Sequence, residues 1–431
     1  MKKIFLAFLM PLIAMPLMAA ESYAMPHIAG IRLEFILFAL TLIGVAVFHH
    51  KTMYVALAGL VAVLLFKWIF SPDFSLVEHI IGTGVREGEW RILLNLAGLL
   101  FGFGILAKHF ELSRIPELMP RYLPNDWKGG FVLLLLIMIL SSFLDNIAAA
   151  MIGGTVAFVV FKGKVHIGYI AAIIAASNAG GAGSVVGDTT TTLMWIDGVN
   201  PLWVVPAFIA SIGAFLVFGI IGAVQQDKYQ RITKDSTPGI LIDHKRLLVV
   251  AAILAGAIFT NYYFEFPALG VWVVILLGSF ISSTPWFELK HSWRGTTFLV
   301  ALVTTASLMP VEDLPAASWQ SAFSLGFVSA VFDNIPLTKL CLEQGGYDWG
   351  VLAYAVGFGG SMIWFGSSAG VALTNLFPQA RSVVLYVKSG WHVILAYIVG
   401  FALLLGVAGW HPHPPHKNNN TNVPVLLKPA S

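Results

Sequence analysis

Apolar runs long enough to cross a lipid bilayer recur along the whole 431-residue chain. Hydrophobic residues make up 58% of the sequence and charged residues only 11%, whereas about a quarter of the residues of a soluble domain are charged. A transmembrane helix needs roughly 17–25 mostly apolar residues. The sequence therefore predicts an all-α polytopic membrane protein embedded in a lipid bilayer. The candidate spans are 33–48, 52–70, 91–107, 166–197, 202–224, 247–264, 268–282, 296–310, 349–377 and 391–410.

The N-terminus has the pattern of a secretion signal. MKK is followed by the apolar run IFLAFLMPLIAMPLMAA and then by small residues. A basic start, an apolar core and a small-residue cleavage site define a signal peptide. We expect residues 1–24 to be a signal peptide, cleaved after Ala20 or Ala24. The alternative is an uncleaved first helix broken by prolines, and both interpretations favour a bacterial inner membrane.

The charge and the cysteine content exclude several classes of protein. A net charge of +3 gives no sign of a nucleic-acid partner. Cys341 is the single cysteine, so no disulfide can form within the chain. We find no nucleotide-binding loop and no Ser/His/Asp or Cys/His arrangement in the sequence. Neither an enzyme, nor ATP-driven transport, nor a cofactor is therefore expected.

Two apolar segments carry the same polar pair, an Asp followed by an Asn. The pairs are Asp145-Asn146 in segment 130–161 and Asp333-Asn334 in segment 320–346. An ionised side chain within hydrocarbon costs several kcal/mol and usually marks a functional position. If the first segment crossed fully, loop 225–246 with its five basic residues would lie outside, against the positive-inside rule. Each segment is therefore predicted to be a re-entrant hairpin, and the two hairpins open to opposite sides.

A glycine-rich stretch follows each hairpin. The stretches are 177-SNAGGAGSVVGDTTTTLMW-195 and 357-GFGGSMIWFGSSAGVALTN-375, and both contain GG, five residues and a further G. Each glycine weakens a helix by about 1 kcal/mol relative to alanine, and irregular backbone at membrane depth is tolerated where it lines a cavity or is buried in protein. Both stretches are therefore predicted to be discontinuous transmembrane helices. The alternative is that the glycines serve close helix packing.

The repeated plan predicts two inverted repeats. The first lies in an N-terminal half, 25–224, and the second in a C-terminal half, 247–410. A cytoplasmic linker, 225–246, joins them, and a polar disordered tail, 411–431, follows. Paired interrupted segments of this kind indicate a transporter site near the bilayer midplane.

Three carboxylates fall within these interrupted segments: Asp145, Asp188 and Asp333. Sodium is a hard cation, and carboxylate, amide, hydroxyl and backbone oxygens suit hard cations. Burial favours the protonated carboxyl, whereas bound sodium favours the ionised one. Competition between proton and sodium for one group is the simplest basis for exchanging them. The alternative is that Asp145 and Asp333 only cap the helices that restart after each tip. Lys339 can pair with a carboxylate or with an anionic substrate.

At these residues the chain resembles the NhaD-type sodium/proton antiporters, which share a superfamily with arsenite permeases and citrate and dicarboxylate carriers. The strings that carry the resemblance are 176-ASNAGGAGSVVGDTTTTLMW-195, 329-SAVFDNIPLT-338 and 354-YAVGFGGSMIWFGSSAGVA-372. The resemblance implies ion sites at the hairpin tips and the unwound segments, with an elevator-like motion, and homodimer formation is a further expectation. The residues it points to are Asp145, Asn146, Asn178, Gly187, Asp188, Thr189, Asp333, Asn334, Thr338, Ser361, Gly366 and Ser367.

The leading functional interpretation is therefore a secondary transporter that exchanges sodium, or lithium, for protons, with these ions as transported species. The alternative is a sodium-coupled carrier of carboxylate anions, which Lys339 and the paired Ser/Thr clusters favour. Two stretches depart from the family's pattern. The second half has 366-GSS-368 where the first has 187-GDT-189, and Lys339 and Glu343 lie in the second hairpin. A third interpretation, an ion channel or sensory subunit, is disfavoured because the hairpins would plug a continuous pore.

Overall fold

The computed structural model describes residues 26–28, 30–48, 51–71, 74–83, 88–233, 239 and 241–413. The described part is helical apart from one short antiparallel pair, β1 (His27–Ile28) and β2 (Ile31–Arg32). The predicted signal peptide 1–24 lies outside the described residues. The helical structure of the described residues confirms the all-α chain predicted from the sequence.

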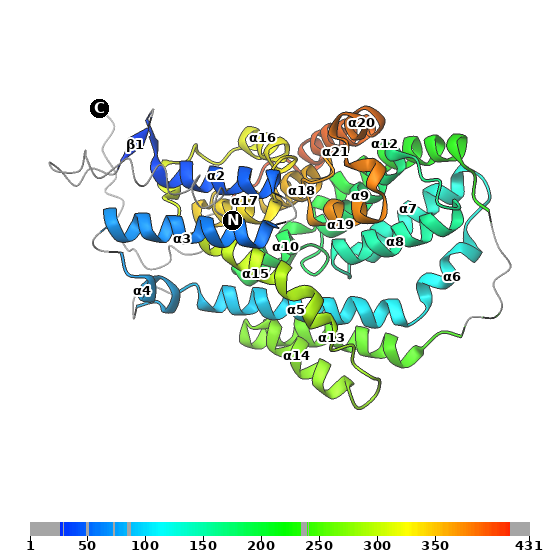
Figure 1. The fold of residues 1–431 in the computed structure, drawn as a ribbon, viewed down its shortest axis with the longest axis horizontal. Helices are drawn as coiled ribbons and strands as arrows, with labels where there is room; N and C mark the ends of the chain where they lie inside the picture. Colours follow the sequence, from blue (N-terminus) through cyan, green and yellow to red (C-terminus); the bar gives the residue numbers. More distant parts are fainter. Residues whose placement is uncertain are drawn as a thin grey trace.

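The N-terminal part of the described chain forms helices α2 to α6. α2 packs on α3, and α5 reaches further along the molecule than its neighbours (Figure 1). These helices are α2 (Leu33–Val47), α3 (Thr52–Phe70), α4 (Leu76–Ile81), α5 (Trp90–Leu112) and α6 (Ile115–Tyr122).

The next helices contain the first Asp-Asn segment and the first glycine-rich stretch. α7 and α8 pack against each other as a helical hairpin, and α9 and α12 both pack on α7. The helices are α7 (Trp127–Ser141), α8 (Asn146–Val160), α9 (Ile167–Ala182), α10 (Thr189–Ile196), α11 (Pro201–Val204) and α12 (Ala207–Tyr229).

The C-terminal helices divide between two regions. α13, α14 and α15 pack on α5, whereas α18 packs on α9, α12 and α21. The helices are α13 (His244–Phe264), α14 (Pro267–Gly278), α15 (Glu288–Ser307), η2 (Val311–Asp313), α16 (Trp319–Ser329), α17 (Asn334–Gln344), α18 (Trp349–Gly359), α19 (Ser368–Leu376), η3 (Pro378–Arg381), α20 (Val383–Ser389) and α21 (Trp391–Ala408).

Two layers follow from these contacts. We call α5, α13, α14 and α15 the α5 layer, and α7–α10, α12, α16–α19 and α21 the central layer. In Figure 1 the α5 layer lies below the central layer, and α8, α10 and α17 lie at the boundary between them. The two layers meet where α5 contacts α10 and α15 contacts α17.

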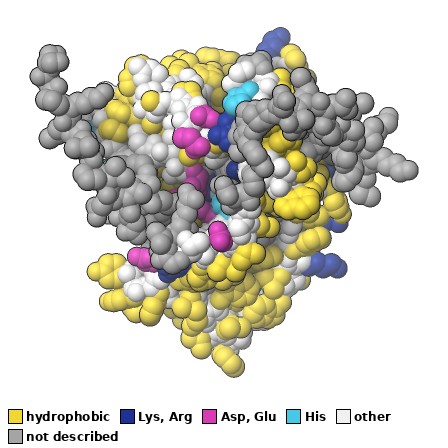
Figure 2. All heavy atoms as spheres, turned by 90° about the vertical axis from the view of Figure 1, so that its left-hand side faces the viewer, with side chains coloured by type: hydrophobic (Ala, Val, Ile, Leu, Met, Phe, Trp, Pro, Cys, Tyr) yellow, Lys and Arg dark blue, Asp and Glu magenta, His cyan; other side chains and the backbone are white. Residues whose placement is uncertain are grey.

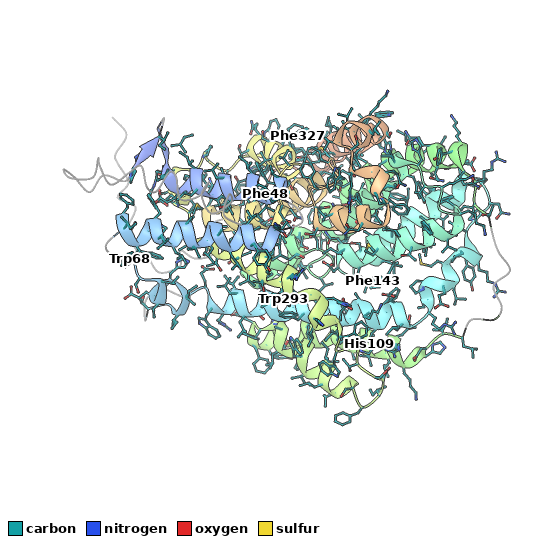
Figure 3. All side chains as sticks on the ribbon, in the orientation of Figure 1. Phe48, Trp68, His109, Phe143, Trp293 and Phe327 are labelled. Carbon is teal, nitrogen blue, oxygen red and sulfur yellow. The ribbon has the colours of Figure 1, made fainter. Side chains whose placement is uncertain are left out.

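Within the described residues, five helical stretches are long and apolar enough to cross a membrane. They are Thr52–Phe70, Trp90–Leu112, Pro201–Tyr229, His244–Phe264 and Trp391–Ala408. Large apolar side chains on their outward faces are exposed, such as Trp68, labelled in Figure 3, at 75%. The chain is thus a multi-pass membrane protein, as predicted.

The start of the predicted disordered tail is ordered. The ring of His413 stacks on Trp203 at a centroid distance of 3.9 Å. Its backbone N–H donates to Tyr347 O, and its carbonyl accepts from Gly346 N. Residues 411–413 are therefore held against the molecule, and the rest of the predicted tail lies outside the described residues.

Candidate functional site

Four helices begin at the candidate site, and each is capped by a side chain predicted from the sequence. Asp145 caps α8, Asp188 caps α10, Asp333 caps α17 and Ser367 caps α19. The backbone N–H groups they accept from are those of Ile147, Thr190, Ile335 and Gly370, in that order. Helix N-termini stabilise negative charge through unpaired N–H groups and the helix dipole. The capping roles predicted for Asp145 and Asp333 are present, and capping leaves other carboxylate lone pairs free.

Both glycine-rich stretches interrupt their helices, as predicted. α9 ends at Ala182 and α10 begins at Thr189, while α18 ends at Gly359 and α19 begins at Ser368. No regular helix is formed between these ends. The interruptions lie against the hairpin tips, so irregular backbone is buried in protein there.

Glycine is required where each interruption meets its hairpin. A Cβ on Gly187 would lie 2.0 Å from Ser141 O at the end of α7. A Cβ on Gly366 would lie 2.5 Å from Ala330 O at the end of α16. The matched positions therefore use glycine for the same close backbone approach. Helix interruption and close packing, stated above as alternatives, occur together.

A buried chain of amide hydrogen bonds joins the two halves. Asn146 Nδ2 donates to Asn178 Oδ1 at 3.0 Å and to Asp188 Oδ1 at 3.3 Å. Asn178 Nδ2 donates in turn to Ser361 Oγ at 2.9 Å. All four side chains are buried. The first hairpin, the first interruption and the second interruption are thus connected through polar side chains.

Asp188 keeps one carboxylate oxygen without a partner. In the part of the chain that the structure describes, Asp188 Oδ2 accepts no hydrogen bond, although the residue is 2% exposed. The neighbouring Thr190 Oγ1 is also buried without a partner. Buried polar atoms are nearly always paired, so such exceptions need an explanation. These oxygen atoms are of the kind that a hard cation takes as ligands.

Asp333, the carboxylate of the second half, is arranged differently from Asp188. Asp333 Oδ1 caps α17 and Oδ2 accepts from Ser368 Oγ at 3.4 Å. Ser368 was not predicted as a site residue, but it occupies the position in 366-GSS-368 that Thr189 occupies in 187-GDT-189, which is the signal that could have identified it. Among the described residues, no three His, Cys, Asp or Glu side chains are placed to hold one metal ion. A sodium ion would therefore combine a carboxylate with amide, hydroxyl or backbone oxygen atoms.

The remaining predicted residues lie along the second hairpin. Asn334 is the first residue of α17 and is 3% exposed. Thr338, one turn later, is buried and donates its hydroxyl to Asn334 O at 2.9 Å. The hydroxyl of Thr338 is thus engaged within its own helix.

A cavity of about 1630 Å³ reaches the site from one end of the molecule. Its inner end is lined by Asp145, Thr189 and Ser368. Its outer part is lined by α5, α6 and the first turns of α15, with charged side chains such as Arg121. Phe143, in the turn between α7 and α8, contacts Phe110 of α5 edge to face at 6.1 Å, and Figure 3 shows Phe143 beside this stretch of α5. The charge bias of the loops predicts that this end faces the cytoplasm.

Lys339 is paired with carboxylates and does not line the cavity. Its Nζ lies 2.6 Å from Glu343 Oε1, 2.9 Å from Glu89 Oε2 and 3.3 Å from Asp197 Oδ1. The lysine is 0% exposed. Of the two roles considered from the sequence, pairing with carboxylates is the one present.

No protein-family model matches the chain. The chain is 24% identical over 328 residues to sodium/proton antiporter 1 of Arabidopsis thaliana, covering 66% of this chain and 56% of that protein. It is 23% identical over 286 residues to the Na+/H+ antiporter NhaD of Vibrio cholerae, covering 54% and 60%. An uncharacterized transporter of Mycobacterium tuberculosis is 27% identical over 392 residues, covering 78% and 87%. The aligned part spans less than two thirds of the two named antiporters. These proteins are transporters rather than enzymes, and the matches confirm the resemblance predicted from the sequence.

Proposed function

We infer that this relative of the NhaD-type sodium/proton antiporters is a secondary active transporter that exchanges sodium for protons. Lithium, a smaller cation of the same charge, is a second candidate ion. The bacterial inner membrane is the proposed location, and alternating access is the proposed mode. The names of the relatives, the buried carboxylate of Asp188 and the half-buried carboxylates of Asp145 and Asp333 support this function.

The observation that carries the proposal is the unpartnered oxygen of Asp188. Asp188 Oδ2 is buried at the start of α10, while Oδ1 already accepts from Asn146 Nδ2 and Thr190 N. A buried ionised carboxylate needs a compensating charge, and without one it takes up a proton. Sodium and a proton would compensate the same charge in alternation. That alternation is the requirement for exchange.

Asp145 and Asp333 are proposed to act with Asp188. Asp145 lines the inner end of the cavity, so ions can reach it from that side. Asp333 contacts the cavity-lining Ser368 through its Oδ2. The amide chain through Asn146 and Asn178 would hold the ligand oxygens in place.

The arrangement of helices supports two inverted repeats with re-entrant hairpins. α8 packs on α19, and α10 packs on α17. In Figure 1 the first pair lies to the right of the second. Each pair takes one helix from a hairpin and one from an interrupted helix of the other half. Such crossing of equivalent elements is what an inverted repeat produces. Homodimer formation remains an expectation of the resemblance.

The test is reconstitution of the purified protein into vesicles loaded with a pH gradient. Sodium, lithium, potassium and citrate are added separately while the internal pH is followed. We expect sodium and lithium to dissipate the gradient and potassium to leave it intact. Dissipation that requires citrate would overturn the proposal and favour the carboxylate carrier. Lys339 no longer supports that alternative, because its ammonium group is engaged by three carboxylates.

A further inference from the structure

The cavity approaches the site from one end and stops at the first turns of α10. Thr189 and Thr192 of α10 line it, whereas Asp197 at the end of α10 does not. Along α17, Asp333 begins the helix at the site and Lys339 follows six residues later. At 1.5 Å per residue this is about 9 Å further from the site. The molecule beyond the cavity is therefore closed by the outer ends of α10 and α17.

The Lys339 cluster lies at this closed end. We define it as Lys339 and Glu343 of α17, Asp197 after α10, and Glu89 before α5. The side chains are between 0% and 16% exposed. Figure 2 looks onto this end of the molecule and shows Asp and Glu side chains gathered near its middle.

Among these ion pairs, the one with Glu89 crosses between the two layers. Glu89 precedes α5, whose later residues form one wall of the cavity. Lys339, Glu343 and Asp197 belong to α17 and α10, which start at the site within the central layer. The same two walls that stand apart around the cavity are thus joined at the other end by the 2.9 Å contact between Glu89 Oε2 and Lys339 Nζ.

We propose that the Lys339 cluster is a lock that closes the outer side of the site and opens once in each transport cycle. This proposal rests on the proposed function, since alternating access requires that the outer side open when the inner side closes. Opening would separate Glu89 from Lys339, while the pair of Lys339 with Glu343 stays within α17.

The chemistry of the cluster suits a two-state contact. Burying an ion pair costs desolvation energy, and the attraction between the two charges offsets this cost when the geometry is good. When the cluster opens, water hydrates the charged groups that lose their partners. These groups are therefore paired in the closed state and hydrated in the open state. Removing Glu89 alone weakens the closed state and leaves Lys339 two carboxylates, which keeps its charge compensated.

The experiment measures how fast one introduced cysteine is labelled from each side of the membrane. Cys341→Ser gives a cysteine-free protein, and Thr192→Cys then places one thiol on the cavity wall between the site and the cluster. A membrane-impermeant maleimide is applied to vesicles of each orientation. In this parent protein, we expect the thiol to be labelled readily from the cytoplasmic side and slowly from the outside.

Glu89→Gln in this background is expected to raise outside labelling about tenfold, because loss of the ion pair with Lys339 weakens the closed state. Cytoplasmic labelling should stay constant or fall. Glu343→Gln is the matched control, because it removes a pair within one helix and should leave outside labelling at the parental rate. Glu89→Asp, which keeps the charge, should also stay near the parent. Unchanged outside labelling in Glu89→Gln, or an equal rise from both sides, would overturn the lock.

A second measurement joins the two sides of the cluster covalently and does not depend on the Glu89→Gln variant. Cysteines replace Glu89 and Glu343 in the Cys341→Ser chain and are joined by a short cleavable bis-maleimide. Transport should stop on cross-linking and return on cleavage, whereas full transport by the cross-linked protein contradicts the lock. Labelling does not depend on which ion is carried. Absence of sodium/proton exchange with asymmetric labelling intact would therefore overturn the proposed function and leave the lock standing.

Discussion

Asn178 and Ser361 lie 183 positions apart in the chain, yet Asn178 Nδ2 donates a 2.9 Å hydrogen bond to Ser361 Oγ. Both side chains are 0% exposed. Asn178 belongs to the end of α9 and Ser361 to the interruption after α18. The bond therefore fixes the two interrupted helices relative to each other at the depth of the site.

Asn178→Ala is expected to weaken sodium binding. The substitution removes the acceptor of Asn146 Nδ2 and the donor to Ser361 Oγ. A net loss of roughly 1 kcal/mol for a hydrogen bond corresponds to an about fivefold higher sodium concentration for half-maximal exchange. Sodium-dependent proton flux in vesicles measures this value. Ser177→Ala is the control, because that hydroxyl donates within its own helix to Ile174 O. An equal loss in both variants would assign the effect to packing.

Asp188→Asn is expected to abolish exchange without unfolding the protein. Asparagine still accepts the capping hydrogen bond from Thr190 N, but it cannot alternate between sodium and a proton. The free energy of unfolding in detergent should not fall, because the substitution removes a buried charge. Asp126→Asn is the control, because it makes the same change at the exposed cap of α7, where the side chain accepts from Lys128 N. Exchange at the rate of the unsubstituted protein in Asp188→Asn would contradict the proposed role.

Asp145→Asn and Asp333→Asn separate capping from ion binding. Asparagine is as good a helix cap as aspartate, so a residue that only caps should keep full flux after the change. We expect both variants to fold and to lose most of their sodium-dependent flux. Asp145→Asn should be the more severe, because Asp145 lines the cavity. Circular dichroism verifies the helix content, and flux in both variants at the parental rate would favour capping alone.

The apolar runs of the sequence predicted the helices but not the polar turns with which some of them begin. The span predicted at 296–310 is the end of α15, which starts at Glu288. Its first turns, ELKHSWRG, are polar because they lie at the cavity. A search for apolar runs misses a helix segment whose environment is water. The loop charges predict that the two hairpins open to opposite sides, and this stays a prediction.

The repeated motif singled out residues that the structure joins by hydrogen bonds, such as Asn146, Asn178 and Ser361, whereas the cluster around Lys339 was not predicted. Glu343 lies four positions after Lys339, a spacing that places both on one helix face. Glu89 and Asp197 come from distant parts of the chain, and only the packing of α10 against both α5 and α17 brings them to the lysine. The order of residues 411–413 has the same origin, since His413 is held by Trp203 and the loop after α17.

Competition between the two ions predicts the pH dependence. A proton bound to the site excludes sodium, so raising the pH empties the site of protons and lowers the sodium concentration needed for half-maximal exchange. For one competing proton the change is about tenfold per pH unit, until the carboxyl is fully ionised. Titration of flux against sodium at several pH values measures it. A sodium requirement that does not change with pH would mean that the two ions bind at separate groups.

Gly187→Ala is expected to disrupt the contact between the first hairpin and the first interruption. The added Cβ would lie 2.0 Å from Ser141 O, and backbone atoms cannot move aside as a flexible side chain can. Overpacking of this kind costs typically about 1–3 kcal/mol, so the melting temperature in detergent should fall together with the flux. Gly406→Ala in α21 is the control, because nothing lies within 4 Å of its added Cβ. That variant should keep its flux and gain about 0.5–1 kcal/mol from its higher helix propensity. Equal melting temperatures for the two variants would show that the interruption tolerates a side chain at position 187.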